Sequence, residues 1–147
     1  MTPTDALRDR VQAAVVRFIA DAILFNHVVA QREGLGPSDG QFITLLQVHG
    51  PMTAGELSAR SGLTTGSTTG VIDRLERAGL AHRVRDRQDR RRVIVTPDDE
   101  AISTRVFPHY AGQAERLGRV LDQRTRDEIE TVAVFFEELV DDQANEG

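Results

Sequence analysis

The tightest constraint on the fold is a pair of helix starts separated by a turn. Thr53 is followed three residues later by a glutamate, which is the spacing of a capping box. Thr64 can cap a second helix, and Gly62 between them suits a tight turn. The pattern predicts two short helices joined by a turn, the first ending near Ser61 and the second near Ala78.

A β-hairpin is expected directly after the second of these helices. Gly79 stands where a C-cap glycine ends a helix. Residues 81–86 and 92–96 are predicted to be strands, because the second run contains consecutive β-branched residues. Residues 87–91 form the loop between them. Two helices, a turn and a hairpin in this order predict a winged helix-turn-helix.

Two further helices are expected before this region. Apolar residues recur at spacings of three and four over residues 5–31, which predicts one long helix. A helix of about 27 residues is long for a small domain, so we expect part of its face to pack on another subunit. Ser38 can cap the second helix, with Gln41 at the capping-box position. The predicted buried stripe of that helix is Phe42, Leu45, Leu46 and Val48.

The chain is expected to end in two helices. Thr96 can cap the first, with Pro97 at its first position and three acidic residues in its first turn. This helix should run to about Leu121, and Asp122 can cap the last one. The predicted fold class is therefore mainly α with a small β-hairpin wing.

The basic charge of the chain is concentrated in one segment. The net charge is −5, and all 18 basic residues are arginine. Residues 60–92 hold nine arginines against four acids, a net of +5, whereas the rest of the chain carries −10. Such a distribution attracts phosphates to one face and repels them from the others, which favours nucleic-acid binding.

The helix over 64–78 has a surface suited to a DNA groove. Its apolar residues fall in one arc at 100° per residue, and the opposite side carries small hydroxyls, two glycines and two arginines. Each helical glycine costs about 0.8–1 kcal/mol relative to alanine, and close approach to a groove would explain that cost. Serine and threonine reach phosphates, base edges and thymine methyls, and arginine suits phosphates. The predicted DNA contacts on this helix are Thr65, Gly66, Ser67, Thr69, Gly70, Arg74 and Arg77. The alternative is a poor surface helix held by its core face, which we expect to be Thr68, Val71, Ile72, Leu75 and Ala78.

The hairpin loop is the second candidate DNA-binding element. Six arginines lie within ten residues, and an exposed hairpin with an arginine tip is shaped to enter a minor groove. Asp86 and Asp89 are expected to pair with neighbouring arginines and hold the loop. The six arginines are Arg83, Arg85, Arg87, Arg90, Arg91 and Arg92. The alternative is a solvated charge run.

These motifs resemble one family. The stretch from Met52 to Leu80, which includes Asp73-Arg-Leu-Glu-Arg-Ala-Gly-Leu80, and the wing Asp86-Arg-Gln-Asp-Arg-Arg-Arg92 are similar to the MarR family of winged-helix regulators. The resemblance covers about residues 38–96 in motif and nearly the whole chain in helix order. Gln88 departs from the pattern, because the family often has arginine there.

The resemblance implies a triangular homodimer in which the long terminal helices interleave. Residues 38–96 would form the DNA-binding region, and residues 1–37 and 97–147 an intertwined dimerisation region. Residues 64–78 would enter the major groove of a pseudo-palindromic operator, and Arg91, oriented by Asp89, the minor groove. The predicted wing contacts are Arg87, Asp89, Arg90 and Arg91. Many members repress transcription until a small phenolic or anionic ligand binds.

Candidate effector-binding residues are His27 on the first helix and His109 and Tyr110 after the hairpin. Histidine can serve an anionic ligand, and a satisfied or exposed histidine is the alternative. The spacing of the four histidines does not support a metal site, and no cofactor motif is present. The chain has no cysteine, which excludes thiol chemistry and fits the cytoplasm.

Other classes of function are disfavoured. The chain lacks lysine and the common hydrolase, metalloprotease and dinucleotide motifs, so we expect no enzyme. No apolar run approaches the roughly 20 residues of a membrane span. A winged helix used for protein contacts without DNA binding is the alternative function, and the basic segment argues against it.

Overall fold

The computed structural model of the 147-residue chain describes residues 2–145. It divides into two compact units, Met1–Pro108 and His109–Gly147, and each is described by itself. The elements of the first unit are α1 (Pro3–Arg32), α2 (Pro37–His49), β1 (Met52–Thr53), α3 (Ala54–Ser61), α4 (Thr65–Arg77), β2 (Ala81–Arg85), β3 (Val93–Pro97), α5 (Asp99–Ala101), a π-helical turn η1 (Ile102–Val106) and a 3-10 turn η2 (Phe107–Tyr110), which ends in the second unit. The second unit then holds α6 (Ala111–Leu121) and α7 (Arg126–Asn145).

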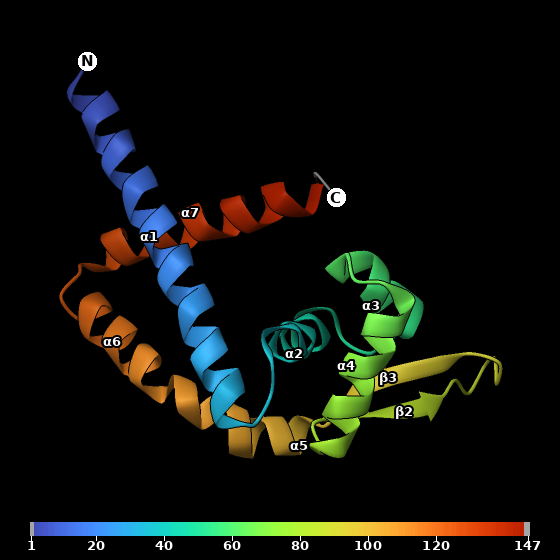
Figure 1. Cartoon of the computed structure of the whole chain (residues 1–147). Helices are drawn as coiled ribbons and strands as arrows, with labels where there is room; N and C mark the ends of the chain where they lie inside the picture. Colours follow the sequence, from blue (N-terminus) through green and yellow to red (C-terminus); the bar gives the residue numbers. More distant parts are fainter. Residues whose placement is uncertain (1, 146–147) are drawn as a thin grey trace. The chain divides into compact units, whose positions relative to one another are not determined.

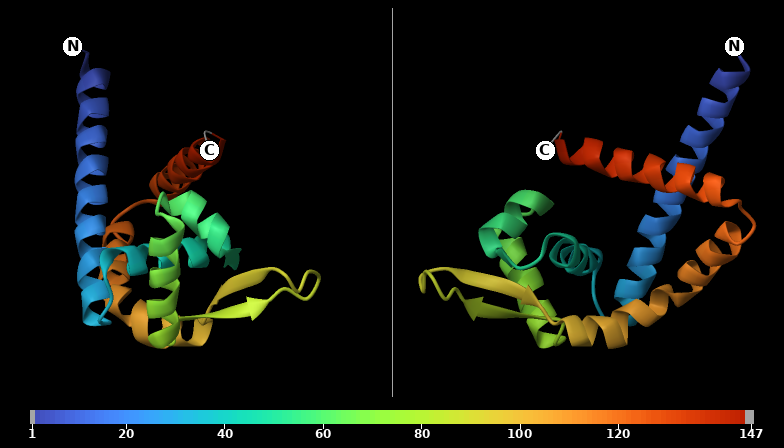
Figure 2. Two further views of the ribbon diagram at one scale, coloured as in Figure 1. Left: turned by 45° about the vertical axis from the view of Figure 1, so that its right-hand side comes forward. Right: turned by 180° about the vertical axis from the view of Figure 1, so that it is seen from behind.

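A three-stranded antiparallel sheet carries the hairpin. The strand order is β1-β3-β2, with Met52 opposite Val95 and Arg83 opposite Val95 on the other side. In Figures 1 and 2 the β2–β3 hairpin stands out beyond α3 and α4. The winged helix-turn-helix and the mainly α fold class are therefore confirmed. The two-residue strand β1 was not expected, because so short a segment has no periodicity to read.

The core of the first unit lies between α2, α3, α4 and the sheet. The largest fully buried apolar side chains come from all of these elements and from η1, and they are Phe42, Leu46, Leu57, Val71, Ile72, Leu75, Leu80, Val95 and Ile102. The predicted stripe of α2 is wrong at Val48, which is 69% exposed, whereas Ile43 is buried. Burial there follows the neighbouring elements α4 and β3, which sequence periodicity does not report.

The helix boundaries of the helix-turn-helix are confirmed. Thr53 accepts a hydrogen bond from the Glu56 N–H at 3.1 Å, and its own N–H donates to the Glu56 carboxylate at 2.9 Å. The Thr64 hydroxyl accepts from the Ser67 N–H at 3.2 Å. Gly62 adopts φ 72° after α3, a left-handed conformation that favours glycine. Local cap chemistry therefore sets these two helices.

Three predicted caps are wrong. Helix α2 starts after Gly36, whose N–H donates to Asp39 at 2.9 Å, because Pro37 has no N–H to lose at the first helical position. Asp98 caps α5, accepting from the Ala101 N–H at 2.9 Å, since residues 96 and 97 still pair in β3. Thr125 takes the place predicted for residue 122, with its hydroxyl accepting from the Glu128 N–H at 3.3 Å.

The long helix predicted after the hairpin is also interrupted. Its first part passes through α5, the π-helical η1 and the 3-10 turn η2 before α6 begins. Pro108 lies in η2 and has no N–H for an α-helical hydrogen bond, which accounts for the change of helix type.

Arg105 of η1 ties the end of α1 to the end of α4. Its guanidinium donates to the Ala78 carbonyl at 2.5 Å and to the Glu33 carboxylate at 3.1 Å. A cation at the last carbonyls of a helix is favourable because those groups carry the negative end of the helix dipole. The position of α4 is thereby linked to the long helix.

Helix α1 exposes most of its apolar residues. Within the described residues it is long and apolar enough, by length and composition, to cross a membrane, so the expectation of no such segment is wrong. One such helix is weak evidence of a membrane span. The exposed large apolar residues of α1 are Leu7, Val11, Val16, Phe18, Ile19, Ile23, Leu24 and Val28. Those of α6 and α7 are Leu117, Val120, Ile129, Val132, Val134, Phe135, Phe136, Leu139 and Val140.

Candidate nucleic-acid interface

The outward face of α4 is made of small polar residues. Thr65, Gly66, Ser67 and Thr69 are exposed, and the core face predicted opposite them is buried except for the half-buried Ala78. The Thr64 hydroxyl donates to the Ser67 hydroxyl at 2.9 Å, and the Thr69 hydroxyl donates to the Thr65 carbonyl at 3.0 Å. These bonds hold the hydroxyls on the helix and leave oxygen lone pairs and methyl groups toward outside partners.

The two glycines of this face have no packing reason to be glycine. A Cβ added at Gly66 would meet nothing within 4 Å, and one at Gly70 would make an ordinary contact of 3.5 Å with Nη1 of Arg74. Neither residue has a positive φ. No contact inside the chain therefore requires glycine at these positions or offsets its helical cost. This agrees with the expected close approach of another molecule.

Arg74 is held by a buried carboxylate. Its Nε donates to Asp39 Oδ1 at 3.0 Å and its Nη2 donates to the same oxygen at 2.8 Å, while the Asp39 side chain is 1% exposed. The hydrogen bond to Asp39 raises the pKa of Arg74. Sequence reasoning assigned Arg74 to phosphates and missed Asp39. The internal pair leaves Nη1 for a contact outside the chain, so the phosphate role of Arg74 stays a prediction.

A second arginine of the predicted basic cluster is also paired internally. Arg83 of β2 donates to Asp73 at 2.8 Å and also to Glu76, both on α4. By contrast, Arg77 at the end of α4 is exposed and has no ion-pair partner among the residues that the structure describes. Of Arg74, Arg77 and Arg83, only Arg77 has no ion pair among the described residues, so its whole guanidinium is available for phosphate.

The wing loop is shaped by its aspartates. Asp86 accepts from the Gln88 N–H at 2.9 Å and lies 3.9 Å from the Arg92 guanidinium. Asp89 accepts from the backbone N–H of Arg91 at 3.0 Å and so fixes the chain at the tip. The predicted ion pair of Asp89 with a neighbouring arginine is not formed among the described residues. Both aspartates make the short local turns for which this residue is favoured.

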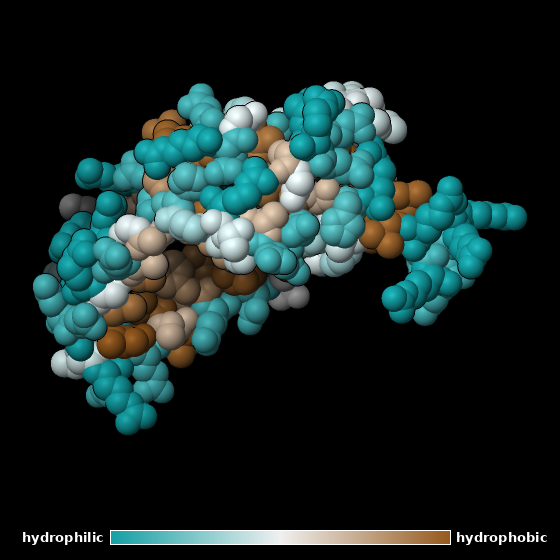
Figure 3. Space-filling model, turned by 90° about the horizontal axis from the view of Figure 1, so that it is seen from below, coloured by the Kyte–Doolittle hydropathy of each residue, from teal (hydrophilic) through white to brown (hydrophobic). Residues whose placement is uncertain are grey.

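The wing arginines divide into two groups. Arg85 donates to the Arg90 carbonyl at 3.1 Å, and Arg92 lies 3.8 Å from Glu56 of α3, so these two hold the loop. Arg87, Arg90 and Arg91 are exposed, with no side-chain ion pair in the described part of the chain. Figure 3 shows the tip of the hairpin as a hydrophilic projection at the right of the view. The structure thus presents three cationic side chains at the end of a braced hairpin.

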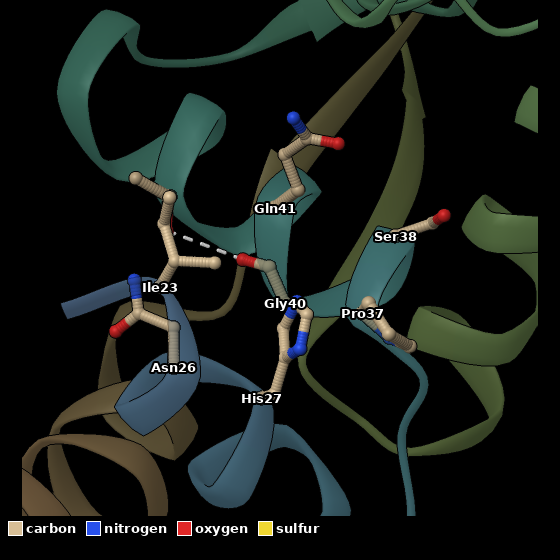
Figure 4. Close-up of a pocket in the computed structure, with 8 residues that line it drawn as sticks. Ile23, Asn26, His27, Pro37, Ser38, Gly40 and Gln41 are labelled. Carbon is tan, nitrogen blue, oxygen red and sulfur yellow. Dashed lines mark hydrogen bonds between the residues drawn. The ribbon is translucent and has the colours of Figure 1, made fainter. Parts of the chain in front are cut away.

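A pocket of about 320 Å³ lies between α1 and the start of α2. Figure 4 shows the His27 ring directed from α1 toward Pro37 and Gly40 of α2. The pocket is lined by Ile23, Asn26, His27, Pro37, Ser38, Gly40, Gln41 and Thr44. His109 and Tyr110 are half-buried at the start of the second unit, and burial raises the pKa of Tyr110. The described residues contain no group of three or more His, Cys, Asp and Glu that could hold a metal ion.

Comparison with known proteins agrees with this geometry. A model of the MarR family matches residues 38–93. The HTH-type transcriptional regulator YcgE of Bacillus subtilis is 37% identical over 119 residues, which cover 81% of this chain and 77% of that protein. YsmB, another HTH-type regulator of Bacillus subtilis, is 35% identical over 68% of this chain and 67% of its own length.

Solved structures share the fold at low sequence identity. A MarR family protein from Bacillus stearothermophilus has a TM-score of 0.69 at 21% identity and covers 98% of this chain and 99% of its own. A mutant of MepR from S. aureus, bound to an oligodeoxyribonucleotide, has a TM-score of 0.58 at 17% identity and covers 90% of this chain and 97% of its own. These likenesses concern the arrangement of the elements.

Proposed function

The chain belongs to the MarR family of DNA-binding transcriptional regulators, and we propose that it is a cytoplasmic, homodimeric repressor whose operator binding is relieved by a small ligand. The observation that carries the proposal is the combination of an exposed small-residue helix face with a braced hairpin, whose tip arginines form no ion pair among the described residues. These are the surfaces needed to enter the major and the minor groove of one duplex.

Helix α4 supplies the major-groove element of the proposal. Its small residues Thr65, Gly66, Ser67, Thr69 and Gly70 allow the helix backbone to approach base edges, while Arg77 contacts phosphate. The wing supplies the minor-groove element through Arg91, with Arg87 and Arg90 beside it on the phosphates. Asp89 holds the tip through the Arg91 backbone.

The dimer is supported by exposed apolar surface on the terminal helices. Burying one large apolar side chain contributes about 1.5–3 kcal/mol, and α1, α6 and α7 together expose many of them. A second copy of the chain would cover this surface through residues 1–37 and 97–147. Two-fold symmetry then requires a pseudo-palindromic operator with half-sites about one helical turn apart.

The pocket between α1 and α2 is the proposed effector site. Its volume of about 320 Å³ is at the lower end of the range for small-molecule sites. His27 would attract an anionic or phenolic ligand there, and His109 and Tyr110 remain candidates for the same role. A ligand at this place would lie beside the N-terminus of α2, where Asp39 binds Arg74 of the recognition helix.

A winged helix used for protein contacts alone is less well supported. It does not account for three exposed arginines at the wing tip or for glycines on α4 that no neighbour requires. The relatives named above are transcriptional regulators rather than enzymes.

The first test is fluorescence anisotropy with a duplex from the intergenic region upstream of the protein's own gene. A scrambled duplex is the control, and both are titrated at two salt concentrations. The proposal expects tight binding to the native duplex and steep weakening with salt, because several arginines displace counterions. If neither duplex binds at low salt, the wing is a protein-docking surface and the proposal fails.

A further inference from the structure

Arg83 begins on the inner face of the hairpin. In the antiparallel ladder it lies opposite Val95, and residues directly opposite each other project from the same face of a sheet. Val95 is 1% exposed and belongs to the core. The Arg83 side chain therefore starts on the face of the hairpin that also carries Val95, although 32% of the side chain stays exposed.

Three hydrogen bonds join Arg83 to α4. Its backbone N–H donates to Glu76 at 3.2 Å, its Nη1 donates to the same carboxylate, and its Nη2 donates to Asp73 at 2.8 Å. The two acids are three residues apart on the helix, so they lie on one side of it. Burial lowers the pKa of Arg83, but the bonds to Asp73 and Glu76 outweigh it and raise that pKa.

Apart from the bonds to Arg83, the presence of two acids on this helix is unfavourable for DNA binding. A carboxylate on an element that enters a groove is repelled by phosphates, and two of them oppose the field of the basic segment. Both are instead partners of Arg83, which brings the hairpin against the helix. The link is placed near the base of a two-stranded extension, where a hairpin alone has little stability of its own.

We propose that Arg83 is a positioning residue that fixes the wing to the recognition helix, so that the major-groove and minor-groove contacts fall at a set spacing. This inference rests on the proposed function. Binding is stronger when the two elements are already held in their bound arrangement, since less freedom is lost on association. Arg83 itself does not contact phosphate in this scheme.

The test uses a variant for which positioning and plain electrostatics predict changes of DNA affinity in opposite directions. Neutralising the acids with Asp73→Asn/Glu76→Gln removes two negative charges near DNA and releases Arg83. Plain electrostatics, or a direct phosphate contact by Arg83, requires this variant to bind the native duplex more tightly. Positioning requires it to bind about tenfold more weakly. The control Asp9→Asn/Glu100→Gln changes the net charge equally at two exposed acids outside the DNA-contacting elements. Both positions lie in the proposed dimerisation region, so size-exclusion chromatography first establishes that the control is still dimeric, and its binding should then not be weakened.

Arg83→Ala gives a second readout. It should weaken binding about tenfold with an unchanged slope of log affinity against log salt, whereas removal of a group that binds phosphate directly lowers that slope by about 0.9. In addition, Arg91→Ala should cost less affinity in the Arg83→Ala background than in the wild type, because an unfixed wing tip contributes less. Additive losses would overturn the inference.

Two further measurements separate the possible failures. Circular dichroism and thermal unfolding establish that each variant is folded before its affinity is read. If the wild type binds no duplex, the proposed function itself fails. If the wild type binds and the Asp73→Asn/Glu76→Gln variant binds more tightly, Arg83 is not a positioning residue although the protein is a DNA-binding regulator.

Discussion

Helix α4 and the wing are both rich in arginine, but the two regions differ in whether their arginines form ion pairs within the chain. Arg74 on α4 is bound to a buried aspartate, and Arg83 at the base of the wing is bound to two acids of α4. At the tip, Arg87 and Arg91 extend from a loop held by backbone turns and have no ion pair among the described residues. The comparison shows that two of the three arginines near the helix, Arg74 and Arg83, hold elements in place, whereas Arg77 and the arginines at the wing tip are available for another molecule.

The largest expected effect on DNA affinity comes from truncating two arginine side chains at the wing tip. Arg90→Ala/Arg91→Ala should lower affinity for the native duplex about a hundredfold, and the salt slope should fall by about one for each phosphate that the variant no longer binds. The free energy of unfolding should change by less than about 0.5 kcal/mol, because both side chains are exposed. Anisotropy and urea unfolding measure the two quantities. Equal affinity of variant and wild type would show that the tip does not bind DNA.

The matching change concerns the partner of Arg74 on α4, which is Asp39 of α2, and it should act on stability. Asp39→Ala removes the partner of Arg74 and the acceptor of the Gly36 N–H. We expect the free energy of unfolding to fall by about 1–2 kcal/mol, as for loss of a helix cap or a hydrogen bond to a charged group. Asp39→Asn is the matched control, because it keeps an acceptor for the cap and loses the charge. A loss from Asp39→Asn as large as that from Asp39→Ala would assign the effect to the ion pair alone.

A substitution at Gly66 separates the contribution of α4 to stability from its contribution to DNA binding. Gly66→Ala should raise the free energy of unfolding by about 0.8–1 kcal/mol, because the new methyl group meets nothing within 4 Å. The same methyl should weaken specific DNA binding if the helix backbone approaches the groove closely. Gly55→Ala in α3, where a Cβ would meet only Thr53 Oγ1 at 3.9 Å, is the control that should leave affinity unchanged. A stabilised Gly66→Ala protein with wild-type affinity would place Gly66 outside the contact surface.

The smallest effect is expected at the side of the wing. Arg92 makes two long ion pairs, at 3.8 Å to Glu56 and 3.9 Å to Asp86, with half of its side chain exposed. Exposed pairs contribute about 0–1 kcal/mol, so Arg92→Ala should change stability little and weaken DNA binding far less than Arg91→Ala. Thermal unfolding and anisotropy decide this. A loss of affinity equal to that of Arg91→Ala would move Arg92 to the contact group.

The helix-turn-helix could be predicted from short-range signals. Thr53 and Thr64 cap their helices through bonds that span three residues, and Gly62 needs its own left-handed backbone. The caps predicted at residues 38, 96 and 122 failed where a neighbour competed for the same role. Pro37 was already in place for α2, and β3 extended through Pro97 by pairing with Ala81.

The sequence by itself determined the order of the main helices and the hairpin, the helix boundaries within the helix-turn-helix, the core face of α4 and the concentration of arginine in one segment. Each of these depends on residues within a few positions of one another, or on composition. Tertiary structure decided which arginines are free. Arg74 meets Asp39 across 35 residues of sequence and Arg83 meets Asp73 across ten, and both pairs exist because packing of α2 and the sheet on α4 brings them together. An arginine has the same charge in either setting, so local pattern cannot distinguish a paired guanidinium from an exposed one.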